Sequence, residues 1–378
     1  MKINQTYQIC NRCVMDTSDP EITFDSSGNC SHCNDFLLRR IHHKYQGEAT
    51  DESFQQLITA IKRDGKGKKY DCIIGISGGI DSSYVALVAK QNGLRILGVH
   101  VDNGWNSDLA VQNIRNIVQK LDIEYQTFVL DWKEFKDLQL AFLKASVPEA
   151  ETPTDIAMLG ALHQIAEQHG VKYIISGGNF ATEGILPAAW HYNAKDMRYL
   201  NYIQKTFGKL KLRKFPKFGV LQETYYKLVK RTKMVYLLNY IDYAKEQAMI
   251  TLEQELAWKY YGGKHYESKY TGFIQSYYLF EKFGIDYRRA TLSSQILTKE
   301  ISREAAIEQV KPLPYKLEVV AEEKKYIAKK LGVSIDEFEE ILKRPAKWYW
   351  DYPNSKGQLN FIYNTYRRIF KKEKLASF

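Results

Sequence analysis

The sequence predicts an α/β protein with a doubly wound parallel sheet, preceded by a small cysteine-rich unit and followed by a mainly helical region. Between residues 71 and 178, four short apolar runs alternate with helical segments, the rhythm of strands joined by crossover helices. Two C-x-x-C pairs come before them, and strand signals fade after about residue 200. We therefore expect a cysteine unit at 1–49, a sheet domain at 50–200, and a basic, helical region at 201–378.

The composition excludes several classes of protein. The 378 residues include 54 Lys+Arg and 44 Asp+Glu, a formal charge of +10, with 44 % apolar and 26 % charged residues. These values are typical of a globular chain and not of a disordered or collagen-like one. No run approaches the ~18 uninterrupted apolar residues of a spanning helix, and the start, MKINQTYQICNRC, lacks the apolar core of a signal peptide. We expect a cytoplasmic protein without a transmembrane segment, where paired cysteines more often bind metal or catalyse than form disulfides.

The elements of the sheet domain follow in order from the residue pattern. Residues 50–63 carry apolar side chains at helical spacing, and DCIIGI at 71–76 is a continuous apolar run before a glycine pair, as in a strand buried on both faces. Similar signals predict further strands at 94–102, 124–130 and 171–178, and helices at 82–92, 108–120, 132–144 and 154–169. Ligands of such sheets bind at the carboxyl ends of the strands.

The cysteine pairs have the spacing of a metal site. Cys10 and Cys13 form one C-x-x-C turn, and Cys30 and Cys33 form the second, with sixteen residues between the two pairs. Two such knuckles joined by a hairpin complete a tetrahedron of thiolates, so we expect a structural zinc ion with no open coordination position. The segment ITFDSSGNC has the strand–turn–strand pattern of that hairpin. An iron–sulfur cluster is the alternative, and replacement of one ligand by His32 is disfavoured.

A glycine- and serine-rich loop follows the first buried strand. Its residues Ser77, Gly78, Gly79, Asp81, Ser82 and Ser83 lie between a strand and a helix. Glycines let the backbone approach a phosphate, successive N–H groups can form an anion-binding nest, and the helix N-terminus adds partial positive charge. The chain has no G-x-x-x-x-G-K-[ST] motif, so this is not a Walker-type loop. A structural glycine turn is the alternative.

The loop SGGIDSS resembles that of the PP-loop ATP-pyrophosphatase superfamily, which includes asparagine, GMP and NAD synthetases and tRNA thiolases. The resemblance implies the adenine nucleotide α-hydrolase-like fold and cleavage of ATP between its α and β phosphates. It also implies nucleotide contacts from the segment after the fourth strand, which contains Gly177, Gly178, Asn179 and Glu183. Asp81 and Glu183 would then share Mg²⁺, since hard carboxylate oxygens suit that cation. The other interpretation of Glu183 is a solvated loop carboxylate.

The end of the second strand is a further match to the superfamily. There the sequence reads Asp102-Asn103-Gly104, and the superfamily places adenine and ribose at this position. An ordinary Asn-Gly turn is the alternative.

The order of the motifs along the chain points to one family within this superfamily. CNRCVMDTSDPEITFDSSGNCSHCNDF, SGGIDSS, VDNGWN, PTDIAM and SGGNFATEG together are similar to the N-acetyl sugar amidotransferases of bacterial surface-polysaccharide (lipopolysaccharide O-antigen) synthesis, over most of residues 8–310. That family implies an ATP-dependent C–N ligase: ATP adenylates the acetamido oxygen of a nucleotide-linked sugar, and ammonia then gives an acetamidino sugar, AMP and pyrophosphate. Thr154 and Asp155 would face the activated amide, or else cap their helix.

The chain has no evident glutaminase nucleophile. No cysteine directly follows Met1, and the fifth cysteine, Cys72, lies inside a predicted strand, where a free thiol usually behaves as a small apolar residue. Ammonia must then come from elsewhere. The resemblance implies a separate glutaminase with a barrel-type ammonia-conducting subunit.

A tRNA thiolase is the main alternative function. Residues 205–233 hold ten Lys/Arg and one acid, interleaved with Phe207, Phe215, Phe218, Tyr225 and Tyr226, a pattern that could bind RNA. Against it, thiolases usually carry cysteines near the segment that here reads PTDIAMLG, so nucleic acid is an unlikely partner. The basic segment could instead be a solvated face or contact a nucleotide sugar, an acidic partner or an anionic membrane.

Three further interpretations remain open. A non-catalytic zinc-knuckle protein with a degenerate nucleotide loop is the alternative from another functional class. Arg288 and Arg289 could bind phosphate as bidentate donors or form surface salt bridges. His191 could contact substrate after the fourth strand or have no chemical role.

Overall fold

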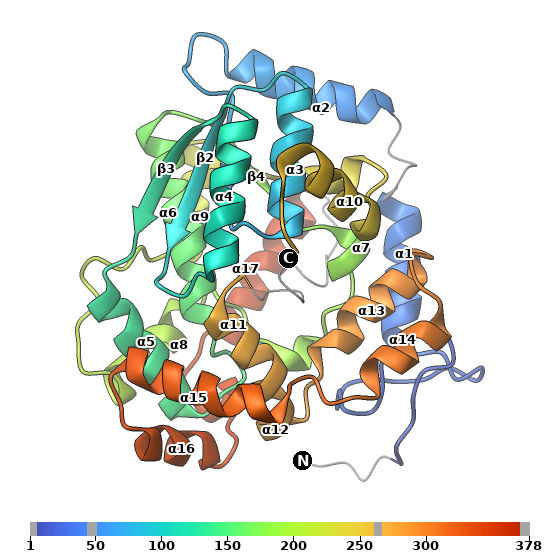
Figure 1. Cartoon of the computed structure of the whole chain (residues 1–378), viewed down its shortest axis with the longest axis vertical. Coiled ribbons are helices and arrows are strands. Elements are labelled where there is room, and N and C mark those ends of the chain that lie inside the picture. The colour runs from blue at the N-terminus through green and yellow to red at the C-terminus, as the bar shows by residue number, and fades with distance from the viewer. Residues whose placement is uncertain (1–5, 44–50, 261–266, 371–378) are drawn as a thin grey trace.

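The computed structural model describes residues 6–43, 51–260 and 267–370 (Figure 1). Its centre is a five-stranded, all-parallel sheet with the order β3-β2-β1-β4-β5. The strands are β1 Cys72–Gly75, β2 Ile96–Asp102, β3 Glu124–Val129, β4 Tyr173–Ser176 and β5 Lys233–Tyr236. The order reverses between β1 and β4, which is where parallel sheets of this kind bind ligands.

Helices cover both faces of the sheet, because successive strand residues point to opposite sides. On one face Ile73, Leu97 and Ile174 pack with α6. On the other, Ile74 and Ile175 pack with α2, α3, α4 and α10, and Figure 1 shows α3 and α4 in front of the strands. These helices are α2 Asp51–Asp64, α3 Ile80–Gln91, α4 Asp108–Lys120, α5 Trp132–Ala145, α6 Thr152–Gln168 and α10 Lys245–Leu256. The predicted doubly wound α/β fold is confirmed.

The fifth strand corrects the sequence-based expectation. No strand was expected beyond residue 200, yet β5 pairs with β4 from Lys233↔Tyr173 to Ser176↔Tyr236. The boundary expected at residue 200 therefore does not coincide with the edge of the sheet. Between the two strands lie α7 Phe180–Glu183, η1 Ala188–Trp190, α8 Met197–Phe207, α9 Val220–Thr224 and the π-helical turn η2 Tyr225–Val229; the 3₁₀ turn η3 Leu237–Tyr240 follows β5.

The cysteine unit contains less regular structure than the sequence pattern indicated. In place of a strand–turn–strand hairpin there are two isolated antiparallel bridges, Ile9↔Asp16 and Phe24↔Cys30. The chain then enters α1, Ser31–His43, so Cys33 lies in the first turn of a helix. In the tight turn at Gly28, the side chain of Asp25 accepts the backbone N–H groups of Ser27 and Asn29. These groups therefore have hydrogen-bond partners within the turn.

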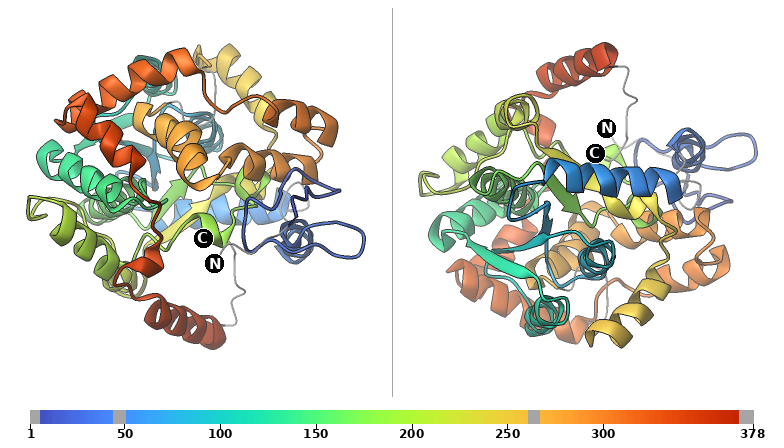
Figure 2. Two further views of the ribbon diagram at one scale, coloured as in Figure 1. Left: turned by 90° about the horizontal axis from the view of Figure 1, so that it is seen from below. Right: turned by 90° about the horizontal axis from the view of Figure 1, so that it is seen from above.

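The last third of the described chain is helical, as expected, and gathers beside the edge at which the strands end (Figure 1). Its elements are α11 Lys269–Phe273, the π turn η4 Ile274–Tyr278, α12 Leu279–Phe283, α13 Tyr287–Leu297, α14 Arg303–Val310, α15 Leu317–Leu331, α16 Ile335–Lys343, the 3₁₀ turn η5 Tyr349–Asp351 and α17 Lys356–Phe370. Figure 2 shows α17 projecting from the rim of the molecule. Within the described ranges, no helix has the length and apolarity that crossing a bilayer would require.

Candidate nucleotide site and metal centre

The glycine- and serine-rich loop lies where the sequence placed it, between β1 and α3. Gly78 has a φ of +82°, and a Cβ there would lie 2.5 Å from the carbonyl oxygen of Ala110 in α4, so only glycine fits. Gly79 is the N-cap of α3, and no described side chain caps the helix. The first N–H groups of a helix without a side-chain cap are suited to an anion.

The serine hydroxyls of the loop hydrogen-bond within the loop. Ser77 Oγ lies 3.0 Å from Ser82 Oγ and accepts the N–H of Gly79 at 3.2 Å. Ser83 Oγ donates to the carbonyl of Gly79 at 2.5 Å. These contacts give the turn a defined shape before any phosphate arrives.

Residues far away in the sequence fix the loop in place. The buried indole of Trp258 donates from Nε1 to the Gly78 carbonyl at 2.9 Å. On the β2 side, Asn106 Nδ2 lies 2.8 Å from His100 Nε2, and His100 Nδ1 lies 3.0 Å from the Ile76 carbonyl. Burial lowers the pKa of His100, so the neutral ring donates from Nδ1 and accepts at Nε2. None of these contacts was expected from the sequence.

Three carboxylates act electrostatically on the buried hydroxyl of Tyr243. The hydroxyl donates to Asp81 Oδ1. Burial, Asp81, Glu300 and Glu183, in that order of importance, raise the pKa of Tyr243 well above its ordinary value. The loop carboxylate Asp81 and the β4-side carboxylate Glu183 therefore both act electrostatically on the same hydroxyl, and a cation shared by the two stays a prediction. Tyr243 and Glu300 had no motif by which sequence reasoning could find them.

The segment after β4 packs directly on the glycine- and serine-rich loop. A Cβ at Gly177 would lie 2.8 Å from the backbone nitrogen of Ser82, so the two backbones touch. Gly178 donates its N–H to Ser176 Oγ at 3.1 Å, and Asn179 caps α7 by accepting the N–H of Thr182 at 2.9 Å. The predicted residues after strands β1 and β4 thus lie together at the switch point of the sheet.

This backbone contact gives a first testable prediction. Gly177→Ala should lower the free energy of unfolding by about 1–3 kcal/mol, because the new methyl group must push apart two backbone segments. Chemical denaturation measures the change. Gly357→Ala is the control, since a Cβ added at Gly357 would meet nothing within 4 Å; equal effects of the two variants would contradict the close approach.

Asp102 and Asn103 both make local turns. Asp102 Oδ1 accepts the N–H of Gly104 at 2.9 Å, and Asn103 Oδ1 accepts the N–H of Trp105 at 3.1 Å. The Asn-Gly turn is therefore present. It also begins at the carboxyl end of β2, beside the strand that leads to the glycine- and serine-rich loop, so a nucleotide contact there stays a prediction.

The start of α6 reaches the same edge of the sheet. Its N-cap is Glu151, without a side-chain cap, so neither Thr154 nor Asp155 caps the helix. Thr154 is buried and Asp155 is exposed. Burial, then Asp155, Glu183 and Glu151, raise the pKa of Tyr287. Tyr287 belongs to the C-terminal region, so three separate parts of the chain meet here.

The four cysteines of the N-terminal unit form a compact buried cluster. Their sulfur atoms all lie within 4.8 Å of one another. The Sγ atoms are 3.8 Å apart for Cys10 and Cys33, and 3.7 Å apart for Cys13 and Cys30. This cluster could bind a metal ion. His32 points elsewhere: its Nε2 lies 2.6 Å from Asp19 Oδ2.

Arginines of the C-terminal helices hold the cysteine unit in place. Arg303 of α14 donates to the carbonyls of Cys10 at 2.8 Å and Cys13 at 3.1 Å. Arg289 of α13 donates to the carbonyl of Val14 at 2.7 Å and forms an ion pair with Asp16 at 3.1 Å. The unit is thus bonded to a region almost three hundred residues further along the chain.

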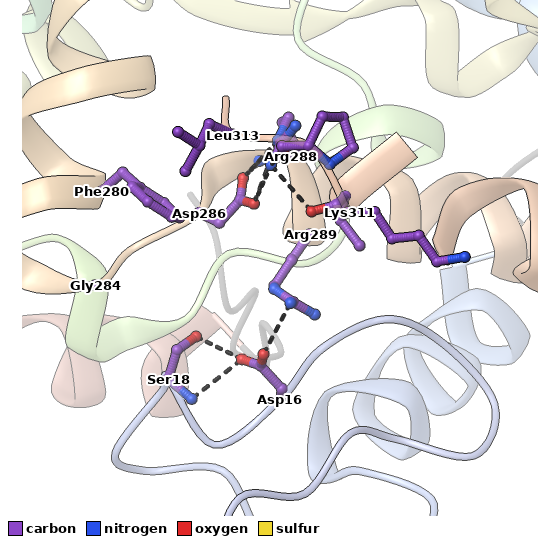
Figure 3. Close-up of a pocket in the computed structure, with 11 residues that line it drawn as sticks. Asp16, Ser18, Phe280, Gly284, Asp286, Arg288, Arg289, Lys311 and Leu313 are labelled. Atoms are coloured by element: carbon purple, nitrogen blue, oxygen red, sulfur yellow. Dashed lines mark hydrogen bonds and ion pairs between the residues drawn. The ribbon is translucent and has the colours of Figure 1, made fainter. Parts of the chain in front are cut away.

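The salt-bridge interpretation of Arg288 and Arg289 is confirmed. Figure 3 shows both side chains lining a pocket of about 190 Å³ between the cysteine unit and α13. Arg288 pairs with Asp286 at 2.7 Å and donates to the carbonyl of Pro312 at 2.9 Å. Both guanidinium groups therefore have structural partners. His191 Nδ1 lies 3.1 Å from the Pro187 carbonyl.

The basic segment 205–233 differs from the RNA-binding pattern. Phe215, Phe218 and Tyr226 are buried, and Phe218 stacks on Tyr226. Several cations have acidic partners outside or inside the segment: Lys214 with Asp131, Lys227 with Glu223 and Lys230 with Glu167. Most of the interleaved aromatic rings are consequently part of the core and cannot stack on bases.

Two family models match the chain. The C-terminal domain of the LPS biosynthesis protein WbpG-like family matches residues 267–369, and the queuosine biosynthesis protein QueC matches residues 71–187. The first includes Tyr287 and the helices beside the sheet edge. The second spans the glycine- and serine-rich loop, the start of α6 and Glu183.

Curated relatives include tRNA-modifying enzymes. A probable mitochondrial tRNA-specific 2-thiouridylase of Caenorhabditis elegans is 26 % identical over 140 residues, 33 % of this chain and 36 % of the relative. The tRNA-specific 2-thiouridylase MnmA of Nitratiruptor sp. is 28 % identical over 213 residues, 49 % of this chain and 60 % of the relative. The chain thus spans about a third to three fifths of the length of these two relatives.

Similar solved structures have low identity. The U34-tRNA thiolase NcsA of Methanococcus maripaludis is 13 % identical, with a TM-score of 0.36 and 90 % of each chain covered. The NH3-dependent NAD synthetase of Campylobacter jejuni is 15 % identical, with a TM-score of 0.29, over 54 % of this chain and 85 % of that one.

Proposed function

Since the chain is a WbpG-like member of the PP-loop family, whose members are ATP-utilising enzymes, we propose that it is an ATP-dependent amidotransferase acting on an N-acetyl sugar linked to a nucleotide. The acetamido oxygen is adenylated, pyrophosphate leaves, and ammonia displaces AMP to give an acetamidino sugar. One observation carries the proposal. The glycine- and serine-rich loop, the start of α6 and Tyr287 of the WbpG-like region converge at the carboxyl edge of the sheet.

Each part of the site has a task in that reaction. The N-terminus of α3, with Gly78 and Gly79, binds the triphosphate, and Ser77, Ser82 and Ser83 turn their hydroxyls to its oxygens. Asp102 and Asn103 bind the nucleoside, and Gly177, Gly178 and Asn179 close the other side. Asp81 and Glu183 would hold Mg²⁺, which would neutralise phosphate charge when bound. Thr154 and Asp155 orient the amide.

An amide is a poor electrophile, so the site has to activate it before ammonia can attack. Adenylation turns its oxygen into a phosphate leaving group. The chain then needs to stabilise charge and exclude water more than it needs a nucleophilic side chain. Cys72 is not such a nucleophile: it is buried in β1, and burial raises the pKa of its thiol. We propose that ammonia is supplied by a separate glutaminase with a barrel-type ammonia-conducting subunit.

For the cysteine cluster we propose a structural zinc ion. Four Zn–S bonds of about 2.3 Å form a tetrahedron with edges of about 3.8 Å, which agrees with the sulfur separations of 3.8 and 3.7 Å. In an iron–sulfur cluster the four cysteines are divided among two or more irons, which spreads their sulfurs further than a single ion does. The zinc would stabilise the unit and take no part in the reaction.

The test is ³¹P detection of AMP and pyrophosphate while candidate nucleotide-linked N-acetyl sugars are supplied with ATP, Mg²⁺ and ammonium chloride. We expect both products in equal amounts, dependent on a sugar that carries an acetamido group. The matched control is the same nucleotide sugar without its N-acetyl group. Equal turnover with both sugars, or release of ADP in place of AMP, would contradict the proposal.

A tRNA thiolase is the second candidate, because curated relatives are 2-thiouridylases. Its RNA contact should then survive about 200 mM salt. We expect instead that binding of purified tRNA, measured by filter retention at rising salt, is weak and lost by that concentration. The reason is that the buried rings of the basic segment cannot stack on bases. Binding would then depend mainly on its charged side chains, and salt screens their attraction to RNA.

A further inference from the structure

Two buried carboxyl groups lie two residues apart, in the loop that joins α5 to α6. Burial raises the pKa of Glu149 to about 7. For Glu151, burial and the nearby charge of Asp155 raise the pKa to about 8, against a hydrogen bond from Thr271 that lowers it. Buried acidic groups of this kind are costly unless they have partners or a function.

The two groups differ in their partners. Glu149 accepts a hydrogen bond from the buried Tyr199 hydroxyl of α8 at 3.1 Å. Glu151 accepts one at Oε2 from Thr271 Oγ1 of α11 at 2.7 Å. Its other oxygen, Oε1, is shielded from solvent and has no hydrogen-bond partner among the described residues, although other atoms of Glu151 are partly exposed. Within the described ranges, that oxygen is left without a donor.

The position of Glu151 is at the reacting edge of the sheet. It is the N-cap of α6, and α6 begins where the strands end. Glu151, Asp155 and Glu183 all act electrostatically on Tyr287, while Glu183 and Asp81 both act on Tyr243. Glu183 thus acts electrostatically on two tyrosines, one of which also feels Glu151 and the other the loop residue Asp81.

The surroundings of Glu151 Oε1 favour binding of a small cation that can donate hydrogen bonds. Glu151 acts electrostatically on the buried Tyr270 as well as on Tyr287, so aromatic side chains stand beside the carboxylates. Negative charge beside aromatic rings binds ammonium-type cations. A donated hydrogen bond would also satisfy Oε1, which no described side chain does.

We propose that Glu151 binds nitrogen that reaches the site as ammonium at Oε1 and takes one of its protons, so that ammonia is released beside the activated amide. This inference rests on the proposed function. The proton passes from ammonium to the Glu151 carboxylate, leaving NH₃ with a free electron pair. That pair forms the C–N bond with the imidate carbon, the C–O bond breaks, and its electrons leave on AMP. The proton then lost from the added nitrogen goes to the departing phosphate.

The test separates the two halves of the reaction. Exchange of labelled pyrophosphate into ATP, with the sugar nucleotide that supports pyrophosphate release and no ammonium, reports adenylation alone. Formation of the acetamidino product with ammonium chloride reports the whole reaction. For Glu151→Gln we expect product formation to fall about a hundredfold, with a much smaller change in exchange. Glu149→Gln is the matched control, a buried neighbour with the same change, and should resemble the wild type.

Hydroxylamine distinguishes catalysis from a structural role. It is largely neutral at pH 7 and needs no prior loss of a proton, so it should restore turnover in Glu151→Gln. A variant damaged only in its packing would not be rescued. Loss of exchange in parallel with product, or equal activity of the two glutamine variants with ammonium, would overturn the inference.

A binding measurement keeps the inference testable if no sugar reacts. Ammonium chloride should raise the melting temperature of the wild type and of Glu149→Gln above that in sodium chloride of equal ionic strength, because a bound ion stabilises the folded state. Glu151→Gln should lose this difference. If the shift is present but no sugar nucleotide gives pyrophosphate, the ammonium site stands and the proposed reaction fails. An equal shift in all three proteins would overturn the site.

Discussion

Asp81→Asn should reduce formation of AMP and pyrophosphate by about a thousandfold while leaving the thermal unfolding of the protein almost unchanged. The substitution keeps the shape of the side chain and an oxygen that can accept from the Tyr243 hydroxyl. It removes the charge that we propose holds Mg²⁺ together with Glu183. The ³¹P assay measures the loss, and calorimetry checks the fold.

Asp64→Asn is the control for this variant. Asp64 also accepts a hydrogen bond from a tyrosine, Tyr173, at 3.1 Å, but Tyr173 begins β4, so this pair lies at the amino ends of the strands. We expect full activity from Asp64→Asn. Activity of Asp81→Asn within tenfold of the wild type would exclude Asp81 as a ligand of the reacting nucleotide.

Cys30→Ser should remove the bound metal and lower the free energy of unfolding by more than about 4 kcal/mol, since loss of a metal is among the most destabilising changes. The four sulfurs are buried within 4.8 Å of one another, and the described part of the unit has little regular structure of its own beyond α1 and two isolated bridges. Metal analysis of protein purified without oxygen gives the stoichiometry, and denaturation gives the stability. Zinc at one ion per chain is the expected result for the wild type.

Cys72→Ser provides the comparison. Cys72 is equally buried but belongs to β1, so its serine variant should keep one metal ion per chain at a cost of about 1–2 kcal/mol. Iron with sulfide in the wild type would contradict zinc. Full metal content in Cys30→Ser would contradict the cluster as the binding site.

The sequence was sufficient to predict the first four strands of the sheet, because their signals are local. The strands β1, β2 and β4 are apolar runs long enough to recognise, and the four cysteines repeat a spacing within one short segment. The strand β5 was missed because it has only four residues, KMVY, directly after a basic run. An edge strand that short has no alternation or apolar run to detect.

The partners of the glycine- and serine-rich loop could not be read from the sequence. Tyr243 meets Asp81 across 162 residues, and Trp258 meets Gly78 across 180. Neither residue stands in a motif, and both positions depend on how α10 packs on the sheet. The role of Glu151 could not be predicted from the sequence either. Its environment depends on Thr271 and Tyr287, which belong to the C-terminal region.

The bonds from Arg303 to the cysteine unit have a consequence for biosynthesis. Cys10 and Arg303 are separated by 293 residues, so the ribosome needs roughly 15–60 s to produce the second after the first. During that interval the contacts of Arg289 and Arg303 with the cysteine unit cannot form, whereas the four thiolates, all made within the first 33 residues, can already bind an ion. The order of assembly would then be metal first and tertiary contact last, which makes the yield of native protein sensitive to the zinc supply during translation.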